Sequence, residues 1–498
     1  MEVLSLLLNG FSVSLQPFAL LAALGGAVLG ILIGAIPGLG SVTAIALLLP
    51  LTFGMDPNVA IIMLTAVYFG CVFGGAYSAI LMNIPGDTPA VMTALDGYPM
   101  SRKGQGGKAL FTANLSSFIG GTIGIVILTF IGPSLATFGL RFGPAETALL
   151  ILFALSSIGW LLGEDAIKGM ASTFLGVLLA TVGIGMTFGT QRFSFGTMEL
   201  INGVSFIPLV IGMFGFAQVL EMAAGVYSAK KPARQIGLRE SLLSRSDIAR
   251  ILPTSIRSGF LGTFVGVLPG AGATTAAFLA YILQRKVGRN GEEMGTGVVE
   301  GVAAAESGNN AAAAASFAPL LSLGIPGSGT SAVLLGGFMM WGLQPGPLLF
   351  TMQPDFVWGL ISSMYVGNLV AILAGIAVIP FLMRILWVRQ QILIPIIAGI
   401  CVVAAYSSGG SMLDVWLMLG FGVFAYMMKL AGYPAAPLVL AFVLTPKLES
   451  SIRQSFDISN GHVGIFFSSY ICIALLSLMG IMIVGLAASS LRKRRHDG

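Results

Sequence analysis

The stretch Gly34-Ala35-Ile36-Pro37-Gly38-Leu39-Gly40-Ser41-Val42-Thr43 interrupts a long apolar segment, and a related stretch recurs at Gly266-Val267-Leu268-Pro269-Gly270-Ala271-Gly272-Ala273-Thr274-Thr275. The spacing that separates Pro37 from Pro269 also pairs Gly40 with Gly272. Proline removes a backbone donor, and glycine adopts backbone angles that other residues avoid. Each stretch therefore predicts a break in a helix.

The composition places these breaks in a membrane protein. The chain has 498 residues, of which 56% are hydrophobic and 9% are charged, against about 25% charged residues in soluble domains. Apolar stretches near the length of a spanning helix predict an all-α polytopic membrane protein with about ten to thirteen transmembrane helices, plus re-entrant or broken helices. Inside a membrane, a broken helix is tolerated where protein or a water-filled cavity satisfies the freed backbone groups.

Little in the sequence indicates an enzyme. The cysteines Cys71, Cys401 and Cys472 are scattered through apolar surroundings, and the two histidines lie near the C-terminus. This pattern matches no transition-metal spacing and no disulfide framework. We expect no catalytic residues, no transition metal and no cofactor other than a coupling ion.

Two further breaks complete the pattern. The second break, Asn83-Ile84-Pro85-Gly86-Asp87-Thr88-Pro89, resembles the fourth, Gly324-Ile325-Pro326-Gly327-Ser328-Gly329-Thr330-Ser331. Here the first break is the stretch around Pro37 and the third is the stretch around Pro269. Broken helices at matching positions of two halves are typical of transporter binding sites. They predict two structural repeats, inverted by analogy with other transporters.

The predicted domains follow from this pairing. The first repeat covers 1–227, a basic linker covers 228–250, and the second repeat covers 251–498. The linker and the basic C-terminal tail are expected on the cytoplasmic side, because basic loops stay there. The polar stretch Asp96–Lys108 is predicted to be an aqueous loop, 168–188 a helix, and Trp358 an interface anchor.

A helix that restarts after a break leaves several N–H groups unpaired, and with the helix dipole they form an anion site. Small hydroxyl residues follow each break and could add donors. An alternative is that the breaks only kink helices for packing. The predicted substrate-binding residues are Gly38, Gly40, Ser41, Thr43, Asn83, Thr88, Gly270, Gly272, Thr274, Thr275, Asn310, Ser328, Gly329 and Thr330.

Acidic residues at membrane depth are functional candidates by default. Asp87 and Glu306 lie beside breaks, and with Asn309 they are the predicted ligands of a coupling ion. Two structural alternatives stay open: Asp87 could cap a helix, and Glu306 could line the mouth of a hairpin in water.

Several motifs resemble a known family. They are Gly34–Gly40, the run Ala76-Tyr77-Ser78-Ala79-Ile80-Leu81-Met82-Asn83-Ile84-Pro85-Gly86, the stretch Asp96-Gly97-Tyr98-Pro99, and Gly324–Ser328. Over nearly the whole chain, these resemble the large membrane subunit of tripartite tricarboxylate transporters, the TctA-like proteins. The resemblance implies symport of citrate-like tricarboxylates or dicarboxylates with sodium or protons across the bacterial inner membrane. It also implies a periplasmic solute-binding protein and a small membrane subunit of four helices as partners.

A passive carboxylate or anion channel is the alternative function, since it would share the broken helices but need no gradient. The sequence offers no ring of charges that would form a selectivity filter. For the transporter, hairpin tips that carry substrate within a mobile block favour an elevator-like motion.

Overall fold

The computed structural model of the chain describes residues 2–161, 166–185, 190–196, 198–225, 242–270, 272–381 and 390–496. Most of the predicted basic linker, up to residue 241, lies outside these residues, as does Ala271 of the third break. The chain divides into two compact units, Met1–Ala136 with Ser205–Ala431 and Thr137–Val204 with Gly432–Gly498. Each unit takes residues from both predicted halves of the sequence.

The fold is almost entirely helical, at 82% of the residues. Among the described residues, eight helices are long and apolar enough to cross a membrane, and shorter apolar helices such as Ser41–Thr52 and Gly329–Met340 accompany them. This confirms the predicted class, an all-α polytopic membrane protein.

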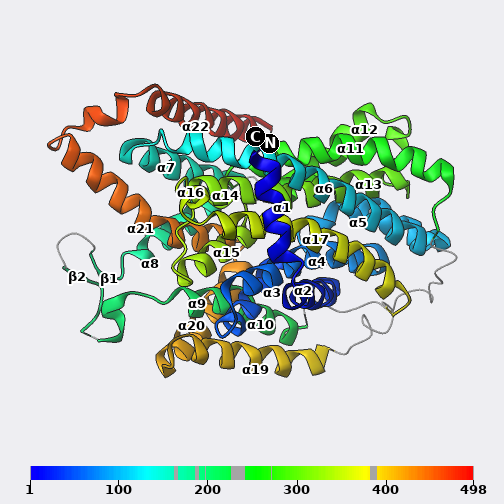
Figure 1. Ribbon diagram of the computed structural model, residues 1–498, viewed down its shortest axis with the longest axis horizontal. Coiled ribbons are helices and arrows are strands. Elements are labelled where there is room, and N and C mark those ends of the chain that lie inside the picture. The colour runs from blue at the N-terminus through cyan, green and yellow to red at the C-terminus, as the bar shows by residue number, and fades with distance from the viewer. Residues whose placement is uncertain are drawn as a thin grey trace. The chain divides into compact units, whose positions relative to one another are not determined.

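The larger unit contains most of the helices (Figure 1). Its helices are α1 (Glu2–Ser14), α2 (Pro17–Ala35), α3 (Ser41–Leu48), η1 (Leu49–Thr52), α4 (Pro57–Met82), α5 (Ala90–Met100), the π-helix η2 (Ser101–Gln105), α6 (Gly106–Gly139), α9 (Phe206–Val210), the π-helix η4 (Ile211–Phe216), α10 (Ala217–Ala223), α11 (Arg245–Val267), α12 (Gly272–Val287), η6 (Gly291–Glu293), α13 (Val299–Ala315), α14 (Phe317–Leu323), α15 (Gly329–Met340), α16 (Leu349–Met352), α17 (Pro354–Val378), η7 (Ile379–Phe381), α19 (Gln390–Gly409) and α20 (Met412–Leu430).

The smaller unit packs α21 against α7 and α8, and α22 against α7. Its elements are α7 (Pro144–Leu161), α8 (Ala166–Ala180), β1 (Gly183–Ile184), β2 (Gln191–Arg192), η3 (Glu199–Asn202), α21 (Ala435–Ile458), η8 (Val463–Phe467) and α22 (Tyr470–His496). The two short strands pair antiparallel, with Gly183 opposite Arg192.

The first break separates α2 from α3 as predicted. Helix α2 ends at Ala35 because Ile36 is extended, and Gly38 has a φ of 85°. The restarted helix α3 has only 8 residues, which at 1.5 Å per residue is too short to cross a bilayer. It is the half-helix that the sequence predicts.

Close glycine contacts pack α2 against α4 in the first half of the sequence and α11 against α13 in the second half. A Cβ added at Gly34 of α2 would lie 2.3 Å from the carbonyl oxygen of Cys71 in α4, and one at Gly266 of α11 would lie 2.5 Å from that of Ala312 in α13. Glycine lets helix backbones approach this closely. The spacing of the breaks also pairs Gly34 with Gly266, and the repeat and its inversion stay predictions.

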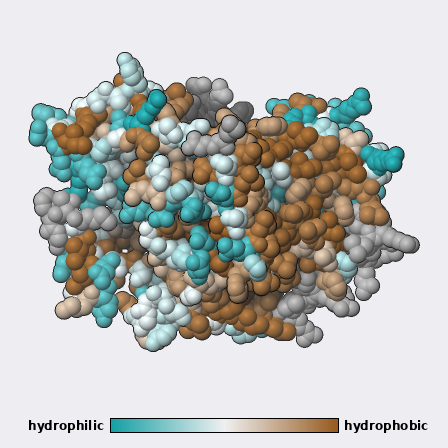
Figure 2. Space-filling view, in the orientation of Figure 1, coloured by the Kyte–Doolittle hydropathy of each residue, from teal (hydrophilic) through white to brown (hydrophobic). Residues whose placement is uncertain are grey.

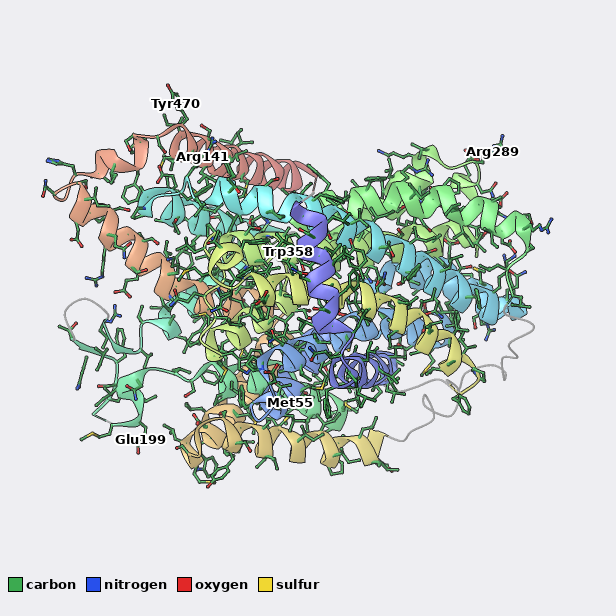
Figure 3. The ribbon with its side chains drawn as sticks, viewed as in Figure 1. Met55, Arg141, Glu199, Arg289, Trp358 and Tyr470 are labelled. Carbon is green, nitrogen blue, oxygen red and sulfur yellow. The ribbon has the colours of Figure 1, made fainter. Side chains whose placement is uncertain are left out.

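Three local predictions are wrong. Residues 96–108 form no aqueous loop but helical α5, η2 and the start of α6, and Asp96 is buried because it bonds backbone N–H groups. The helix expected over 168–188 ends at Ala180, where the chain turns into β1 through Gly183, with a φ of 109°. Trp358 is no interface anchor: it is buried where α17 contacts α1, a helix that the sequence reading did not anticipate (Figure 3).

Part of the surface of the larger unit is apolar. Figure 2 shows hydrophobic side chains gathered over the area where α2 and α17 lie in Figure 1. Phe18 and Leu21 of α2 and Leu373 of α17 are among the exposed hydrophobic residues. Such a surface suits a lipid environment, where no hydrophobic gain favours burying it.

Candidate functional site

The first, second and fourth breaks meet around the carboxylate of Asp87. The Ser41 backbone N–H donates to Asp87 Oδ2 at 3.1 Å, and the Ser41 hydroxyl donates to the same oxygen at 2.7 Å. The Thr88 N–H donates to Oδ1 at 2.8 Å. A hydrogen bond of 2.9 Å joins the Ser41 and Thr330 hydroxyls. We refer to Asp87, Ser41, Thr88 and Thr330 as the Asp87 network.

Local backbone geometry brings these breaks together. Asn83 caps the C-terminus of α4 with a left-handed φ of 58°, and Gly324 caps that of α14 with a φ of 70°. A Cβ at Gly86 would lie 1.9 Å from the Gly34 carbonyl oxygen, and one at Gly40 would lie 2.8 Å from Asp87 Oδ1. Glycine at Gly86 and Gly40 therefore allows the second break to lie directly against the first.

The carboxylate of Asp87 lies at the N-terminus of α3. Helix N-termini attract anions through their unpaired N–H groups and the helix dipole. The N-cap residue of α3, Gly40, has no side chain with which to cap the helix. The first break thus has the geometry of a carboxylate site, and a carboxylate of the chain itself fills it here.

The fourth break is capped by its own side chains. Ser328 forms a capping box with Ser331: the Ser331 N–H donates to Ser328 Oγ at 3.2 Å, and the Ser328 N–H donates to Ser331 Oγ at 2.8 Å. The hydroxyl of buried Tyr68 lies 3.5 Å from Ser328 Oγ. Because Thr330 bonds Ser41, the starts of α15 and α3 face one another.

The third break lies beside the fourth. A Cβ at Gly327 would lie 3.0 Å from the Gly266 carbonyl oxygen. Gly270 and Gly272 have φ values of 77° and 67°, which other residues rarely adopt. Thr274 and Thr275 are half-buried in the first turn of α12. Within the described part of the chain, no hydrogen bond joins these two threonines to the Asp87 network.

The π-helix η4 borders the first break and was not predicted from the sequence. Thr43 Oγ1 donates to the carbonyl oxygen of Phe214 in η4, at 3.4 Å. Single π-helical turns inside α-helices often occur at functional sites. In the sequence, the only indication of this π-helix is the pair of glycines Gly212 and Gly215. Gly212 packs against α20, and Gly215 packs against Leu47 and Cys401.

Glu306, Asn309 and Asn310 lie in the middle of α13, which packs against Gly266 of the third break through Ala312. The Glu306 carboxylate accepts hydrogen bonds from the Thr93 hydroxyl and, at 3.0 Å, from the Ser117 hydroxyl. Asn310 Nδ2 donates to the Glu306 carbonyl oxygen at 3.0 Å. We refer to these five residues as the Glu306 cluster. Nearby on α6, Asn114 accepts a hydrogen bond of 2.6 Å from the Tyr77 hydroxyl.

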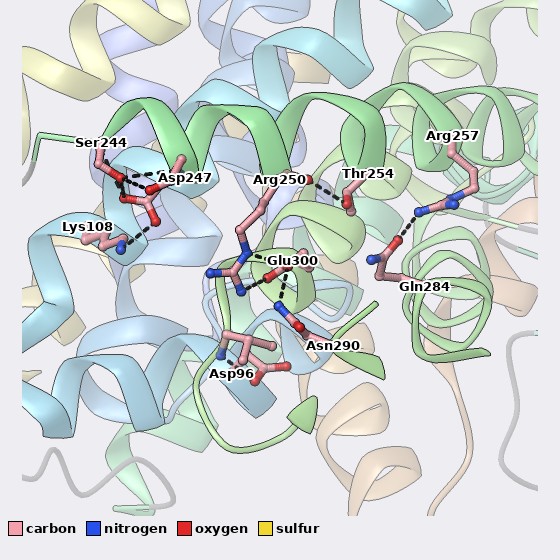
Figure 4. Close-up of polar contacts among 12 residues, drawn as sticks. Asp96, Lys108, Ser244, Asp247, Arg250, Thr254, Arg257, Gln284, Asn290 and Glu300 are labelled. Atoms are coloured by element: carbon pink, nitrogen blue, oxygen red, sulfur yellow. Dashed lines mark hydrogen bonds and ion pairs between the residues drawn. The ribbon is translucent and has the colours of Figure 1, made fainter. Parts of the chain in front are cut away.

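The N-terminus of α13 is held by Asp96 of α5 (Figure 4). Its Oδ1 accepts the backbone N–H groups of Gly297 and Val298 at 2.8 and 2.9 Å. Gly295 also donates to this carboxylate, and the Tyr281 hydroxyl donates to Oδ2 at 2.8 Å. Asp96 lies in the motif Asp96–Pro99, but the sequence predicted a loop there and indicated no role for Asp96.

Charged residues gather at the start of α11 (Figure 4). Lys108 Nζ lies 2.7 Å from Asp247 Oδ1, and Arg250 Nε lies 2.6 Å from Glu300 Oε1. Burial acts to raise the pKa of Asp247, but the hydrogen bonds from Lys108 and Ser244 outweigh it and hold that pKa below its ordinary value. The hydrogen bond to Glu300 raises the pKa of Arg250. These pairs stabilise a polar end of the helical unit.

Several features of the chain are typical of transporters: paired helix breaks, a carboxylate at a helix N-terminus and buried polar side chains in a polytopic membrane protein. Residues 20–440 match the model of the tripartite tricarboxylate transporter TctA family, and the chain belongs to this family.

Two proteins of Agrobacterium vitis are similar to the chain. The uncharacterized 52.8 kDa protein of the TAR-I ttuC′ 3′ region is 37% identical over 499 residues, which cover 99% of this chain and 98% of that protein. An uncharacterized protein of the TAR-II ttuC′ 3′ region is 37% identical over 236 residues, or 47% of this chain and 98% of that protein. No solved structure matches the chain.

Proposed function

We propose that the chain is the large membrane subunit of a secondary active transporter that imports tricarboxylates or dicarboxylates by symport. The family supports a role in a tricarboxylate transporter. The proposal adds uptake driven by sodium or protons in the bacterial inner membrane, with the C-terminus in the cytoplasm. The proposed partners are a periplasmic solute-binding protein that delivers the substrate and a small membrane subunit of four helices.

The observation that carries the proposal is the Asp87 carboxylate on the N-terminus of α3. Two donors of Ser41 and the N–H of Thr88 hold it. Among the described residues, no Lys or Arg forms an ion pair with Asp87. Backbone and hydroxyl donors therefore suffice to hold a carboxylate at this break, as substrate binding at the breaks requires.

In the proposed cycle, a substrate carboxylate replaces Asp87 at the donors of Ser41 and is bonded by the Thr330 hydroxyl. The remaining predicted residues of the four breaks then contact the rest of the substrate. Because Asp87 leaves as the substrate arrives, the site exchanges one carboxylate for another. This limits the cost of leaving buried N–H donors unpaired. We propose that the hairpin tips move together with the bound substrate, in an elevator-like motion.

Glycine variants with matched controls test the site. In Gly40→Leu the added side chain would displace Asp87, whereas Gly25 on α2 has nothing within 4 Å of an added Cβ. In Gly272→Leu the leucine is strained by a φ of 67° within the third break. Its control is Gly410→Leu, because Gly410 has a similar φ of 66° but lies outside the breaks, with nothing within 4 Å of an added Cβ. Uptake of labelled carboxylates by the reconstituted complex should fall strongly in the two test variants and not in Gly25→Leu or Gly410→Leu. Unchanged uptake in both test variants would remove the breaks from the substrate site.

A further inference from the structure

The carboxylate of Glu306 is enclosed by protein on all sides. Every residue of α13 is buried, and Glu306 is 0% exposed. Glycines bring the surrounding helices to contact distance: a Cβ at Gly120 of α6 would lie 2.1 Å from the Ser307 carbonyl oxygen, and one at Gly262 of α11 would lie 2.3 Å from that of Gly308. An ionised carboxylate at such a place is costly unless a cation compensates it.

No cationic side chain of the described residues is paired with Glu306. Within the described ranges, no Lys, Arg or His forms an ion pair with it, and its carboxylate oxygens accept from two neutral hydroxyls. Glu300 on the same helix provides the contrast. It is paired with Arg250 at 2.6 Å and accepts a further hydrogen bond from Asn290 at 2.9 Å.

Two further oxygen atoms on the same stretch of α13 have no partner. Asn309 Oδ1 and Asn310 Oδ1 are buried and accept no hydrogen bond. Residues three and four positions apart are neighbours on a helix surface, so both asparagines follow Glu306 by about one turn. The bond from Asn310 Nδ2 to the Glu306 carbonyl holds the Asn310 amide beside this turn. An unpartnered buried acceptor costs about 1–3 kcal/mol, so two of them beside a carboxylate indicate a missing electrophile.

We infer that the Glu306 cluster is a binding site for one sodium ion. Carboxylate, amide and hydroxyl oxygens are hard ligands that suit an alkali or alkaline-earth cation. The cluster contains one carboxylate, which balances the charge of a monovalent cation. A proton on Glu306 could donate to only one of the two unpartnered amide oxygens, whereas a cation can accept several oxygen ligands at once.

This inference deepens the proposed function, because it names the coupling ion and separates its site from the substrate site. Asp87 is satisfied by donors on α3 and on its own loop, whereas the Glu306 cluster presents acceptors. The two predicted coupling-ion carboxylates therefore have different roles. Asp87 occupies the anion site, and Glu306 with Asn309 and Asn310 binds the cation.

Direct sodium binding tests the inference without any carboxylate substrate. The purified full chain in nanodiscs is titrated with radioactive sodium, and bound sodium is measured at equilibrium. The wild type should bind sodium saturably, and Glu306→Gln should weaken binding by at least about tenfold, because the charged ligand is lost. Asn310→Ala should weaken it several-fold. Glu300→Gln changes a paired carboxylate on the same helix and should leave sodium affinity unchanged.

A second measurement keeps the inference testable if Glu306→Gln does not fold. Sodium, compared with choline at equal ionic strength, should raise the melting temperature of the wild type, since a ligand that binds only the folded state stabilises it. Thr93→Val, which removes one hydroxyl ligand, should reduce this increase. Absence of saturable sodium binding in the wild type would overturn the inference, as would equal binding by folded Glu306→Gln. Sodium binding without carboxylate uptake would contradict the proposed substrate and leave the ion site standing.

Discussion

Replacing Asp96 with alanine should loosen the N-terminus of α13. In the wild type, the Asp96 carboxylate receives three backbone N–H groups from residues 295–298 and the hydroxyl of Tyr281. The contact fixes the α12–α13 connection to α5. Because α13 carries Glu306 and Asn310, Asp96 is predicted to position the Glu306 cluster without belonging to it.

The magnitude follows from the donors that lose their partner. Each buried donor left unpaired costs about 1–3 kcal/mol, and water entering the emptied space recovers part of this cost. Gly295 is exposed and Gly297 is half-buried, so water can replace their bonds. The Val298 N–H and the Tyr281 hydroxyl are buried, and for these two donors a loss of about 2–6 kcal/mol is expected for Asp96→Ala. Asp96→Asn keeps one acceptor oxygen for the N–H groups of Gly297 and Val298, and the Tyr281 hydroxyl can rotate to accept. Its expected loss is therefore smaller, about 1–2 kcal/mol.

Thermal unfolding of the detergent-solubilised chain, followed by size-exclusion chromatography, measures this order. Asp96→Ala should melt well below Asp96→Asn, which should melt below the wild type. Asp355→Ala removes an exposed carboxylate from the first turn of α17 and is the control, with little change expected. Sodium binding should weaken in the same order as stability. Equal melting of Asp96→Ala and Asp355→Ala would refute the predicted role of Asp96.

Three other predictions concern stability and packing. The pKa of Asp247 lies below its ordinary 3.8, so its pair with Lys108 stabilises the fold above that value, and this stability is lost as the pH falls below it. Acid unfolding should show a smaller loss in Lys108→Gln than in the wild type, because the hydrogen bonds from Ser244 remain. Gly86→Ala puts a methyl group 1.9 Å from the Gly34 carbonyl oxygen and should abolish uptake, while Gly25→Ala should not; equal uptake would show that the first two breaks need no close contact. A double-mutant cycle of Arg250→Gln and Glu300→Gln in thermal unfolding should give a coupling of about 1–3 kcal/mol, and additive effects would show that the ion pair contributes nothing.

The helix breaks could be predicted from the sequence because proline and glycine act locally. Pro37 and Gly38 end α2 without help from distant residues, and Asn83 takes a left-handed conformation that a short polar side chain tolerates. The predicted half-helix at Ser41 and the membrane class follow in the same way from local composition. The resemblance to the family also rests on such local motifs.

The contacts that join the breaks could not be predicted from local pattern. Ser41 and Thr330 are far apart in the sequence, and so are Asp96 and the loop that it binds. Polar residues at 96–108 suggested water, but Asp96 is buried because backbone donors from another part of the chain satisfy it. Likewise, no sequence period marks Thr93 and Ser117 as partners of Glu306, since the three helices that carry them meet only in the folded chain.

The most direct test of the central claim is accumulation of a labelled carboxylate in proteoliposomes under an inward sodium gradient. The proteoliposomes contain the chain with its small membrane subunit, and the periplasmic binding protein is supplied outside. The account predicts accumulation above equilibrium that is lost when the gradient is collapsed, is lost in Gly40→Leu, and persists in Gly25→Leu. Uptake that never exceeds equilibrium, as a passive channel would give, or full accumulation in Gly40→Leu would contradict it.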